Sequence, residues 1–244
     1  MHIIKLNAIG STNTFLKDLV LTNRVENYTV VTAESQFGGR GQMGASWESE
    51  DGKNLIFSMF VKLDSFFLED SVSLNYAVSL AVYKILKRYV SSNLYVKWPN
   101  DILSDSKKIC GLLIENSISS NKIKHSIIGI GINVNQEVFS KKLKMVTSIK
   151  NIIGQQVDKD LLLKEITNQV KIEIENCVPV NFLKLKERYL SVLYRYLAPT
   201  MFQKSDGTIF LGKIVGVSTK GDLEIELDDA SIHFFGLKEI KILR

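Results

Sequence analysis

The spacing of apolar residues changes at Pro199, and this change constrains the fold more than any other feature of the sequence. Before it, stretches with helical spacing, such as that from Val72 to Val90, alternate irregularly with β-branched and aromatic runs that predict strands. After it, the chain contains only short strand-like runs separated by turn residues. Because a strict strand–helix alternation is missing, we expect an α+β domain with a mixed sheet over residues 1–198 and a small β-barrel or sandwich over residues 199–244.

The expected elements follow from the local period of the apolar residues. In the first domain, strands are expected at 2–6, 28–32, 54–63, 94–97, 109–115 and 122–134, with a hairpin turn at 116–121. Helices are expected after the capping residues 11–13 and at 72–90, 160–176 and 181–197. In the second domain, strands are expected at 208–217, 223–227, 232–235 and 240–243.

Charge and composition exclude several classes of protein. The chain has 31 basic and 26 acidic residues, a formal net charge of +5, but the stretch from Thr200 to Arg244 has six basic and seven acidic residues. The second domain therefore lacks the basic surface of a nucleic-acid-binding module. No apolar run approaches the roughly 20 residues that span a bilayer. The two cysteines cannot form a disulfide scaffold, so we expect a cytoplasmic protein without membrane contacts.

A glycine-rich segment, Gly39–Gly44, has the letters of the dinucleotide motif and begins like a P-loop, but both matches fail on inspection. The dinucleotide motif G-x-G-x-x-G must open a helix, and the residues that follow lack a helical period. The P-loop motif requires a lysine where Ala45 stands. What remains is a loop with exposed amides and one arginine, which can wrap around an anion. An ordinary surface loop explains the glycines equally well.

Two lysines precede an apolar strand. Lys107 and Lys108 lie directly before Ile109, and a lysine at the mouth of a strand can hold a phosphate or carboxylate as a point charge. Asp101, just after a proline turn, could face a metal ion or an amine. Taken singly, Lys107 and Lys108 are more simply explained as solvated side chains, and Trp98 as a core residue.

Glycines at alternate positions mark a later strand. Gly129 and Gly131 leave one face of it bare, so a flat ring or another backbone can approach closely. Asn133 offers a donor and an acceptor that would suit an adenine edge. Close packing of the strand on a helix is an equally good explanation of the glycines.

Several short segments occur in a fixed order along most of the first 135 residues. They are Gly10-Ser11-Thr12-Asn13, Thr32–Gln36 leading into Gly39-Arg40-Gly41, Trp47, Asn54-Leu55, Lys97-Trp98-Pro99-Asn100-Asp101, Lys108 with Gly111, and Gly129–Asn133. Each is weak alone, but the ordered set resembles the biotin–protein ligases, also called biotin–[acetyl-CoA-carboxylase] ligases. The small C-terminal domain is similar to the SH3-like domain of that family.

The resemblance implies a two-step reaction. Biotin's carboxylate attacks the α-phosphate of ATP, which accompanies Mg²⁺, and biotinyl-5′-adenylate and pyrophosphate form. A lysine of a biotin carboxyl carrier domain then attacks the adenylate and releases AMP. Because both reactants of the first step are anions, a preorganised cation is needed, and losing such a stabiliser typically costs about 3–4 kcal/mol.

The resemblance also implies the residues that act. The catalytic residues would be Lys108 and Arg40. The biotin site would consist of Ser11, Thr12, Asn13, Gln36, Arg40, Gly41, Gln42, Lys108 and Gly111. The ATP site would consist of Arg40, Trp47, Asn54, Lys97, Lys108, Gly131 and Asn133. Asp101 would bind Mg²⁺ or accept the proton of the acceptor lysine.

The sequence departs from the family in two places. Many relatives have the loop sequence G-R-G-R-x-G-R with three arginines, whereas this loop keeps only Arg40. Fewer positive charges would therefore lie near the phosphates. Many bacterial relatives also have an N-terminal winged-helix DNA-binding domain. Only ten residues precede Ser11 here, so we expect no DNA partner. Exposed strand edges could pair with the carrier domain or with a second copy in a homodimer.

Two other interpretations remain open. A lipoate–protein ligase would share the fold and the two-step logic, although the Lys97–Asp101 segment and the Gly39–Gly41 loop favour biotin. A noncatalytic nucleotide- or RNA-binding protein would suit the basic net charge, although the charge-balanced C-terminus disfavours it.

Overall fold

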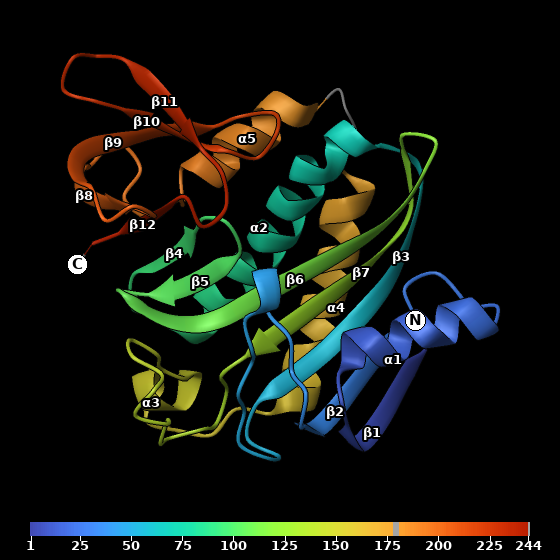
Figure 1. Ribbon diagram of the computed structural model, residues 1–244. Helices are drawn as coiled ribbons and strands as arrows, with labels where there is room; N and C mark the ends of the chain where they lie inside the picture. The colour runs from blue at the N-terminus through green and yellow to red at the C-terminus, as the bar shows by residue number, and fades with distance from the viewer. Residues whose placement is uncertain (178–180, 244) are drawn as a thin grey trace.

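The computed structural model describes residues 1–177 and 181–243, apart from the side chain of Asp64. Within these residues the chain forms two sheets, with helices packed against the first (Figure 1). The first sheet has the strand order β1-β2-β3-β7-β6-β5-β4. Its strands are β1 (Ile3–Ile9), β2 (Val30–Gln36), β3 (Leu55–Phe67), β4 (Leu94–Lys97), β5 (Asp101–Ser104), β6 (Lys107–Ser119) and β7 (Lys122–Ile132). β1 pairs with β2 in parallel and the other neighbours are antiparallel, so the expected mixed sheet is confirmed.

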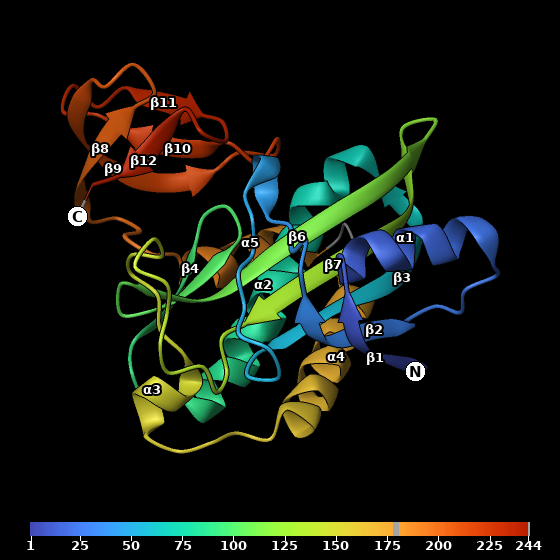
Figure 2. The ribbon, with the colours of Figure 1, turned by 60° about the horizontal axis from the view of Figure 1, so that its bottom comes forward.

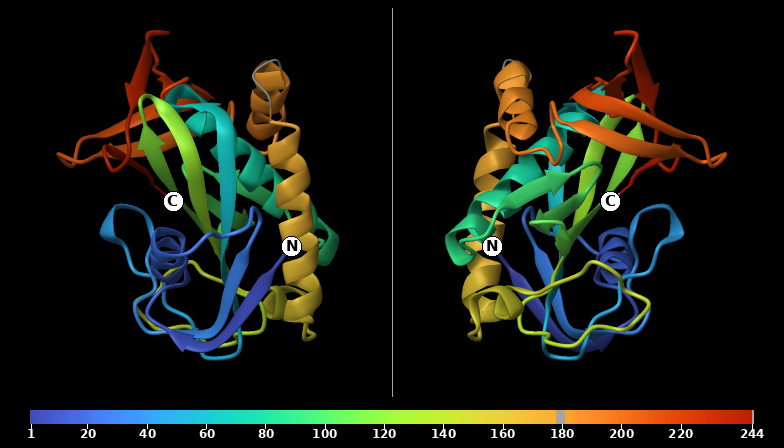
Figure 3. Two further views of the ribbon diagram at one scale, coloured as in Figure 1. Left: turned by 90° about the vertical axis from the view of Figure 1, so that its right-hand side faces the viewer. Right: turned by 90° about the vertical axis from the view of Figure 1, so that its left-hand side faces the viewer.

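Helices lie on both faces of this sheet. They are α1 (Thr12–Thr22), α2 (Ser71–Tyr89), α3 (Ile149–Ile153), α4 (Lys159–Glu175) and α5 (Phe182–Leu190), with short 3-10 turns η1 (Gln42–Gly44) and η2 (Leu68–Asp70). Figure 3 shows α2 and α4 on one face, and α1 on the other. In the described part of the chain, no helix is long and apolar enough to cross a membrane.

Strand alternation decides which residues face which helices. On β7, Ile128 and Ile130 belong to the main core with α2 and α4, whereas Ile127 belongs to a smaller core under α1. Because successive side chains of a strand point to opposite faces, Gly129 and Gly131 lie on the α1 face. The bare part of the strand therefore lies beside α1.

The main core packs α2, α4 and α5 against the face of the sheet opposite α1. Tyr76 of α2 stacks on Tyr189 of α5 with ring centroids 4.1 Å apart, and both side chains are buried. Burial raises the pKa of both phenols. Pairs of buried aromatic rings contribute well beyond their area, so α2 and α5 hold one another in place behind the sheet.

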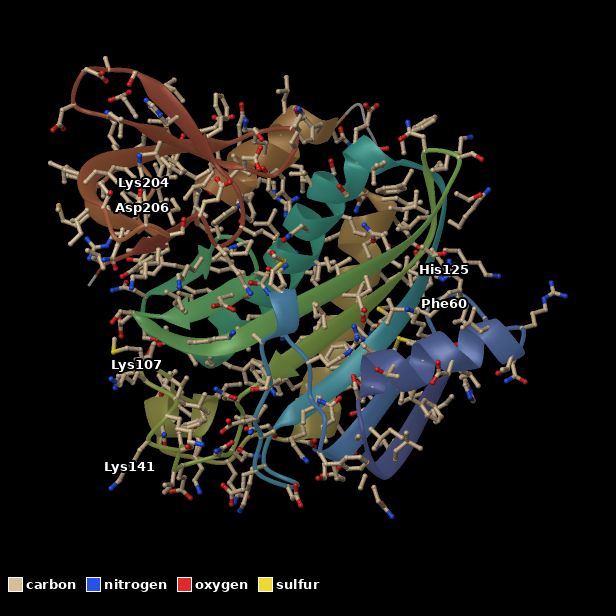
Figure 4. All side chains as sticks on the ribbon, in the orientation of Figure 1. Phe60, Lys107, His125, Lys141, Lys204 and Asp206 are labelled. Atoms are coloured by element: carbon tan, nitrogen blue, oxygen red, sulfur yellow. The ribbon has the colours of Figure 1, made fainter. Side chains whose placement is uncertain are left out.

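A histidine lies toward the far end of the sheet. His125 of β7 packs against Phe60 of β3 with ring centroids 5.3 Å apart (Figure 4). Burial lowers the pKa of His125, because the imidazolium form loses hydration there. This position is distant along β7 from Gly131, so we treat it as part of the fold.

The second sheet is antiparallel. Its strands are β8 (Pro199–Lys204), β9 (Ile209–Val217), β10 (Leu223–Glu226), β11 (Ile232–Phe235) and β12 (Ile240–Ile242), in the order β11-β10-β9-β8-β12. Phe202, Phe210 and Phe235 stack in its interior. This sheet agrees with the expected small SH3-like domain, and the division after residue 198 stays a prediction.

Five expectations about secondary structure were incomplete or wrong. β5, α3 and β8 were not expected. The helix expected at 181–197 ends at Leu190, since Tyr194 then donates from its backbone to the carbonyl of Val96 in β4. The expected turn at 116–121 is tighter: β6 continues to Ser119 and the chain reverses at Ser120 and Asn121, both with positive φ.

Candidate active site

Three glycines form a bare strip on the α1 face of the sheet. Gly111 of β6 lies opposite Gly131 of β7, and Gly129 lies two residues along. A Cβ on Gly131 would come within 2.6 Å of the Trp47 indole, and one on Gly111 within 3.0 Å of it. The indole therefore rests flat against the backbone, and we call these three residues the glycine strip.

Polar side chains at the start of α1 bound one end of the strip. Ser11 caps the helix. The Ser58 hydroxyl lies 2.7 Å from Thr12 Oγ1 and 2.5 Å from Asn13 Oδ1. Gln36 Oε1 accepts from the Thr12 amide at 2.7 Å. Hydroxyls and amides can each donate and accept, so this buried cluster can match a polar ring that also does both.

A glycine-rich loop, residues 37–46, covers the strip, and we call it the flap. Arg40 and Ser46 form an isolated β-bridge at its base. The Arg40 guanidinium donates to Glu115 Oε2 at 2.7 Å, and Asn13 Nδ2 donates to the same oxygen at 2.8 Å. Glu115 thus ties the flap to the start of α1.

Lys108 lies at the other end of the strip. Its Nζ is 2.6 Å from Asp101 Oδ1 and 5.4 Å from the centroid of the Trp47 ring. A Cβ on Gly111 would come within 3.1 Å of Lys108 Nζ. The lysine, the carboxylate and the indole therefore meet at one point.

A shift of register in β6 brings Lys108 to this face. Lys108 and Gly111 are three positions apart and would face opposite sides of a regular strand. Cys110 pairs with Ile102 of β5, but the next pair along β5 is formed by Lys108, so Ile109 is an extra residue. Such bulges re-aim side chains beside functional sites. Ile109 and Cys110 are both fully buried in the main core, where burial raises the pKa of the Cys110 thiol.

The space above the strip is small. The cavity between the strip, the polar cluster and the flap measures about 40 Å³. Pockets for small organic ligands are typically about 300–1,000 Å³. Trp47 occupies part of the space above Gly111 and Gly131, yet its buried Nε1 has no hydrogen-bond partner among the described groups, which costs roughly 1–3 kcal/mol. We infer that the flap and Trp47 move outward when a ligand enters.

Both asparagines suggested to bind ATP, Asn54 and Asn133, form hydrogen bonds within the protein. Asn54 Nδ2 donates to Gln136 Oε1 at 2.5 Å, and Asn54 Oδ1 accepts from the Val134 amide. The Asn54 side chain therefore holds the segment that follows β7 in place. Asn133 Nδ2 donates to the Thr147 carbonyl at 3.0 Å. Both side chains are buried, and their contacts with ATP stay predictions.

Lys97 and Gln42 lie outside the small cavity. Both line a larger cleft of about 630 Å³ between the flap, the turn after β4 and the second sheet. The remaining suggested residues, Ser11, Thr12, Asn13, Gln36, Arg40, Gly41, Trp47, Gly111 and Gly131, line the small cavity together. Lys108 and Asp101 stand at its edge through their contacts with Trp47 and Gly111.

Sequence reasoning missed two residues of this site. Ser58 lies opposite Gly129 in the register of β3 and β7, a pairing that the sequence does not reveal. Glu115 could have been found, because it is a charged residue four positions after Gly111 on the same face of an apolar strand.

In the part of the chain that the structure describes, no three His, Cys, Asp or Glu side chains gather to hold a metal ion. Asp101 is a single carboxylate already paired with Lys108. Mg²⁺ commonly binds through one or two carboxylates together with the phosphates of its substrate, so this arrangement fits a metal that arrives with a nucleotide.

The sequence profile of the Biotin/lipoate A/B protein ligase family matches residues 6–133, which include every residue around the cavity. The chain belongs to this family. It is 29% identical over 242 residues to the bifunctional ligase/repressor BirA of Bacillus spizizenii, covering 98% of this chain and 72% of that protein. It is 32% identical over 106 residues to the biotin–[acetyl-CoA-carboxylase] ligase of Paracoccus denitrificans, covering 43% of each.

A solved structure also resembles the whole chain. The biotin protein ligase from Aquifex aeolicus in complex with biotin and ATP superposes with a TM-score of 0.81 and 27% identity, covering 100% of this chain and 99% of the other. The fold expected from the family resemblance is therefore confirmed for both sheets.

Proposed function

We propose that this chain is a biotin–protein ligase, which activates biotin with ATP and transfers it to a lysine of a biotin carboxyl carrier domain. One observation carries the proposal. A single glycine strip connects the polar cluster at Thr12 to the ammonium group of Lys108, beneath the flap. A ligand with a polar ring at one end and a carboxylate at the other suits this strip.

In the first step, an oxygen of the biotin carboxylate bonds to the α-phosphorus of ATP, and the bond to the β-phosphate oxygen breaks. Lys108 would lie between the two anions and offset their repulsion. Arg40 leaves Glu115 and approaches the phosphates, and the flap amides of Gly41 and Gln42 close over the product. The main core packed against the sheet keeps these groups preorganised, which is the main source of this kind of catalysis.

In the second step, the carrier lysine nitrogen bonds to the acyl carbon of the adenylate, and AMP leaves. The attacking amine must first lose a proton, because its ordinary pKa is about 10.4. Asp101 is the nearest carboxylate to Lys108, at 2.6 Å, and we propose it as the acceptor of that proton. Closure of the flap excludes water, which would otherwise hydrolyse the adenylate.

Mg²⁺ would enter with ATP, held chiefly by the phosphates and water. Asp101 is the described side chain best placed to reach it. Trp47 would move away from Gly131 and line one side of the nucleotide site. There the nucleotide would offer an acceptor to the indole Nε1, which now has no partner.

The partner would be a carrier domain that presents a lysine on an exposed turn. β1 and β4 are the outer strands of the first sheet, but the outer edge of β4 already bonds to the backbone of Val192 and Tyr194. We therefore propose that the β1 edge adds a strand of the carrier or of a second copy of the chain.

The experiment is a competition between cofactors. The purified chain is incubated with ATP, Mg²⁺, an apo carrier domain and equal concentrations of biotin and lipoate, and the carrier is then weighed by mass spectrometry. We expect the mass of one biotinyl group on one lysine. A lipoyl mass would instead favour the lipoate ligase, and an unmodified carrier with salt-dependent RNA binding would favour the noncatalytic alternative.

A further inference from the structure

We propose that Lys238 in the second sheet is a positioning residue that holds the flap closed over the cavity. Its Nζ donates to the backbone carbonyl of Met43 at the tip of the flap, at 2.7 Å and across 195 positions of sequence. Figure 2 shows the flap tip next to the second sheet. The contact itself does not depend on the proposed function; its consequence for the adenylate does.

The turn that carries Lys238 is well fixed. The Glu239 side chain accepts from the Gly236 amide at 2.8 Å, and its carbonyl accepts from the Ser205 amide at 2.8 Å. Lys238 has φ of 66°, a conformation that this closed turn imposes. The backbone of Lys238 is therefore held in a defined turn, and its exposed side chain reaches from there to Met43.

The second sheet is in turn fixed to the site. Trp98 Nε1 donates to the Gly221 carbonyl at 2.9 Å, and Trp98 is three residues before Asp101. The same sheet thus touches both the segment that carries Asp101 and the tip of the flap.

The flap needs such a support at its tip. Its base is held by the ion pair of Arg40 with Glu115, but Met43 is 56% exposed and has φ of 52°. A Cβ on Gly44 would meet no atom within 4 Å. Because this flap has one arginine, an ammonium from the second sheet would supply charge and a hydrogen bond that the flap itself lacks.

The direct test is hydrogen–deuterium exchange of the ligand-free chain. Three amides in the flap and at its base report how well the flap is ordered, because Gly41 donates to Ala45, Ala45 to Gln42, and Trp47 to Gly39. Lys238→Met should speed their exchange about 2- to 10-fold, the factor that one net hydrogen bond contributes. Lys238→Arg should restore slow exchange. Lys241→Met is the matched control, since Lys241 lines the same cleft without touching the flap, and it should leave exchange unchanged.

The second test follows the intermediate. With preformed biotinyl-adenylate on the chain, Lys238→Met should release it about 2- to 10-fold faster into a chase of unlabelled biotin, and Lys241→Met should not. Unchanged exchange in Lys238→Met, or an equal effect of Lys241→Met, would overturn the proposal. A chain that makes no adenylate would defeat the proposed function, and the exchange experiment would still decide whether Lys238 holds the flap.

Discussion

Replacing Lys108 by methionine should separate catalysis from folding. The substitution keeps most of the apolar stem and removes the charge. The side chain is 32% exposed and its ion pair with Asp101 is partly solvated, so the loss of folding stability should not exceed about 1 kcal/mol. The loss in catalysis should be larger, because the ammonium faces charge that develops in the transition state.

The expected loss can be worked from two contributions. Removing one preorganised stabiliser typically slows a step about 100- to 1,000-fold, or roughly 2.7–4 kcal/mol. In addition, Asp101 is left without its partner at 2.6 Å, and its carboxylate then repels both anionic reactants. The rate of adenylate formation should therefore fall at least about 100-fold, while the carrier-transfer step from added adenylate falls less.

The assay is a single-turnover measurement of biotinyl-adenylate, with thermal unfolding as the check on folding. Lys107→Met is the matched control, because Lys107 is the exposed neighbour on the same strand (Figure 4). Adenylate formation by Lys108→Met at the rate of the Lys107 variant would refute the reasoning.

Three further substitutions test other parts of the account. Gly129→Ala places a Cβ against the Asn13 amide, so the KM for biotin should rise about 10-fold or more while the KM for ATP changes little; equal changes would contradict the position of the polar cluster. Trp98→Phe removes the bond to the Gly221 carbonyl, and protection of the flap amides should decrease about 2- to 10-fold as the second sheet loosens; unaltered protection would separate the sheet from the flap. His125 has a lowered pKa in the folded chain, so its contribution to stability is present above its ordinary value of about 6.5 and is lost as the pH falls below it. Between about pH 7.5 and about pH 5.5, the melting temperature of His125→Gln should fall less than that of the unmodified chain. An equal fall in both would contradict a lowered pKa of His125 in the folded chain.

Much of the site was predictable because its chemistry is local in sequence. Alternate glycines at 129 and 131 predicted a bare strand face, and the structure shows an indole lying on it. Lys108 at the mouth of an apolar strand predicted a charge near that face. The ordered segments predicted the family, and the sequence profile confirmed it.

The rest depends on register, which the sequence does not display. Ser58 joins the polar cluster because it pairs with Gly129 across two strands. Lys108 shares a face with Gly111 because one extra residue, Ile109, interrupts the alternation of β6. The contact of Lys238 with Met43 spans nearly the whole chain, and no periodicity could reveal it.

The central claim is that this site joins the carboxylate of biotin to the α-phosphate of ATP. Exchange of labelled pyrophosphate into ATP tests it most directly, because the exchange needs only the first step and no carrier. We expect exchange that depends on added biotin and is lost in Lys108→Met. Absence of exchange in the unmodified chain, or exchange at the same rate without biotin, would contradict the account.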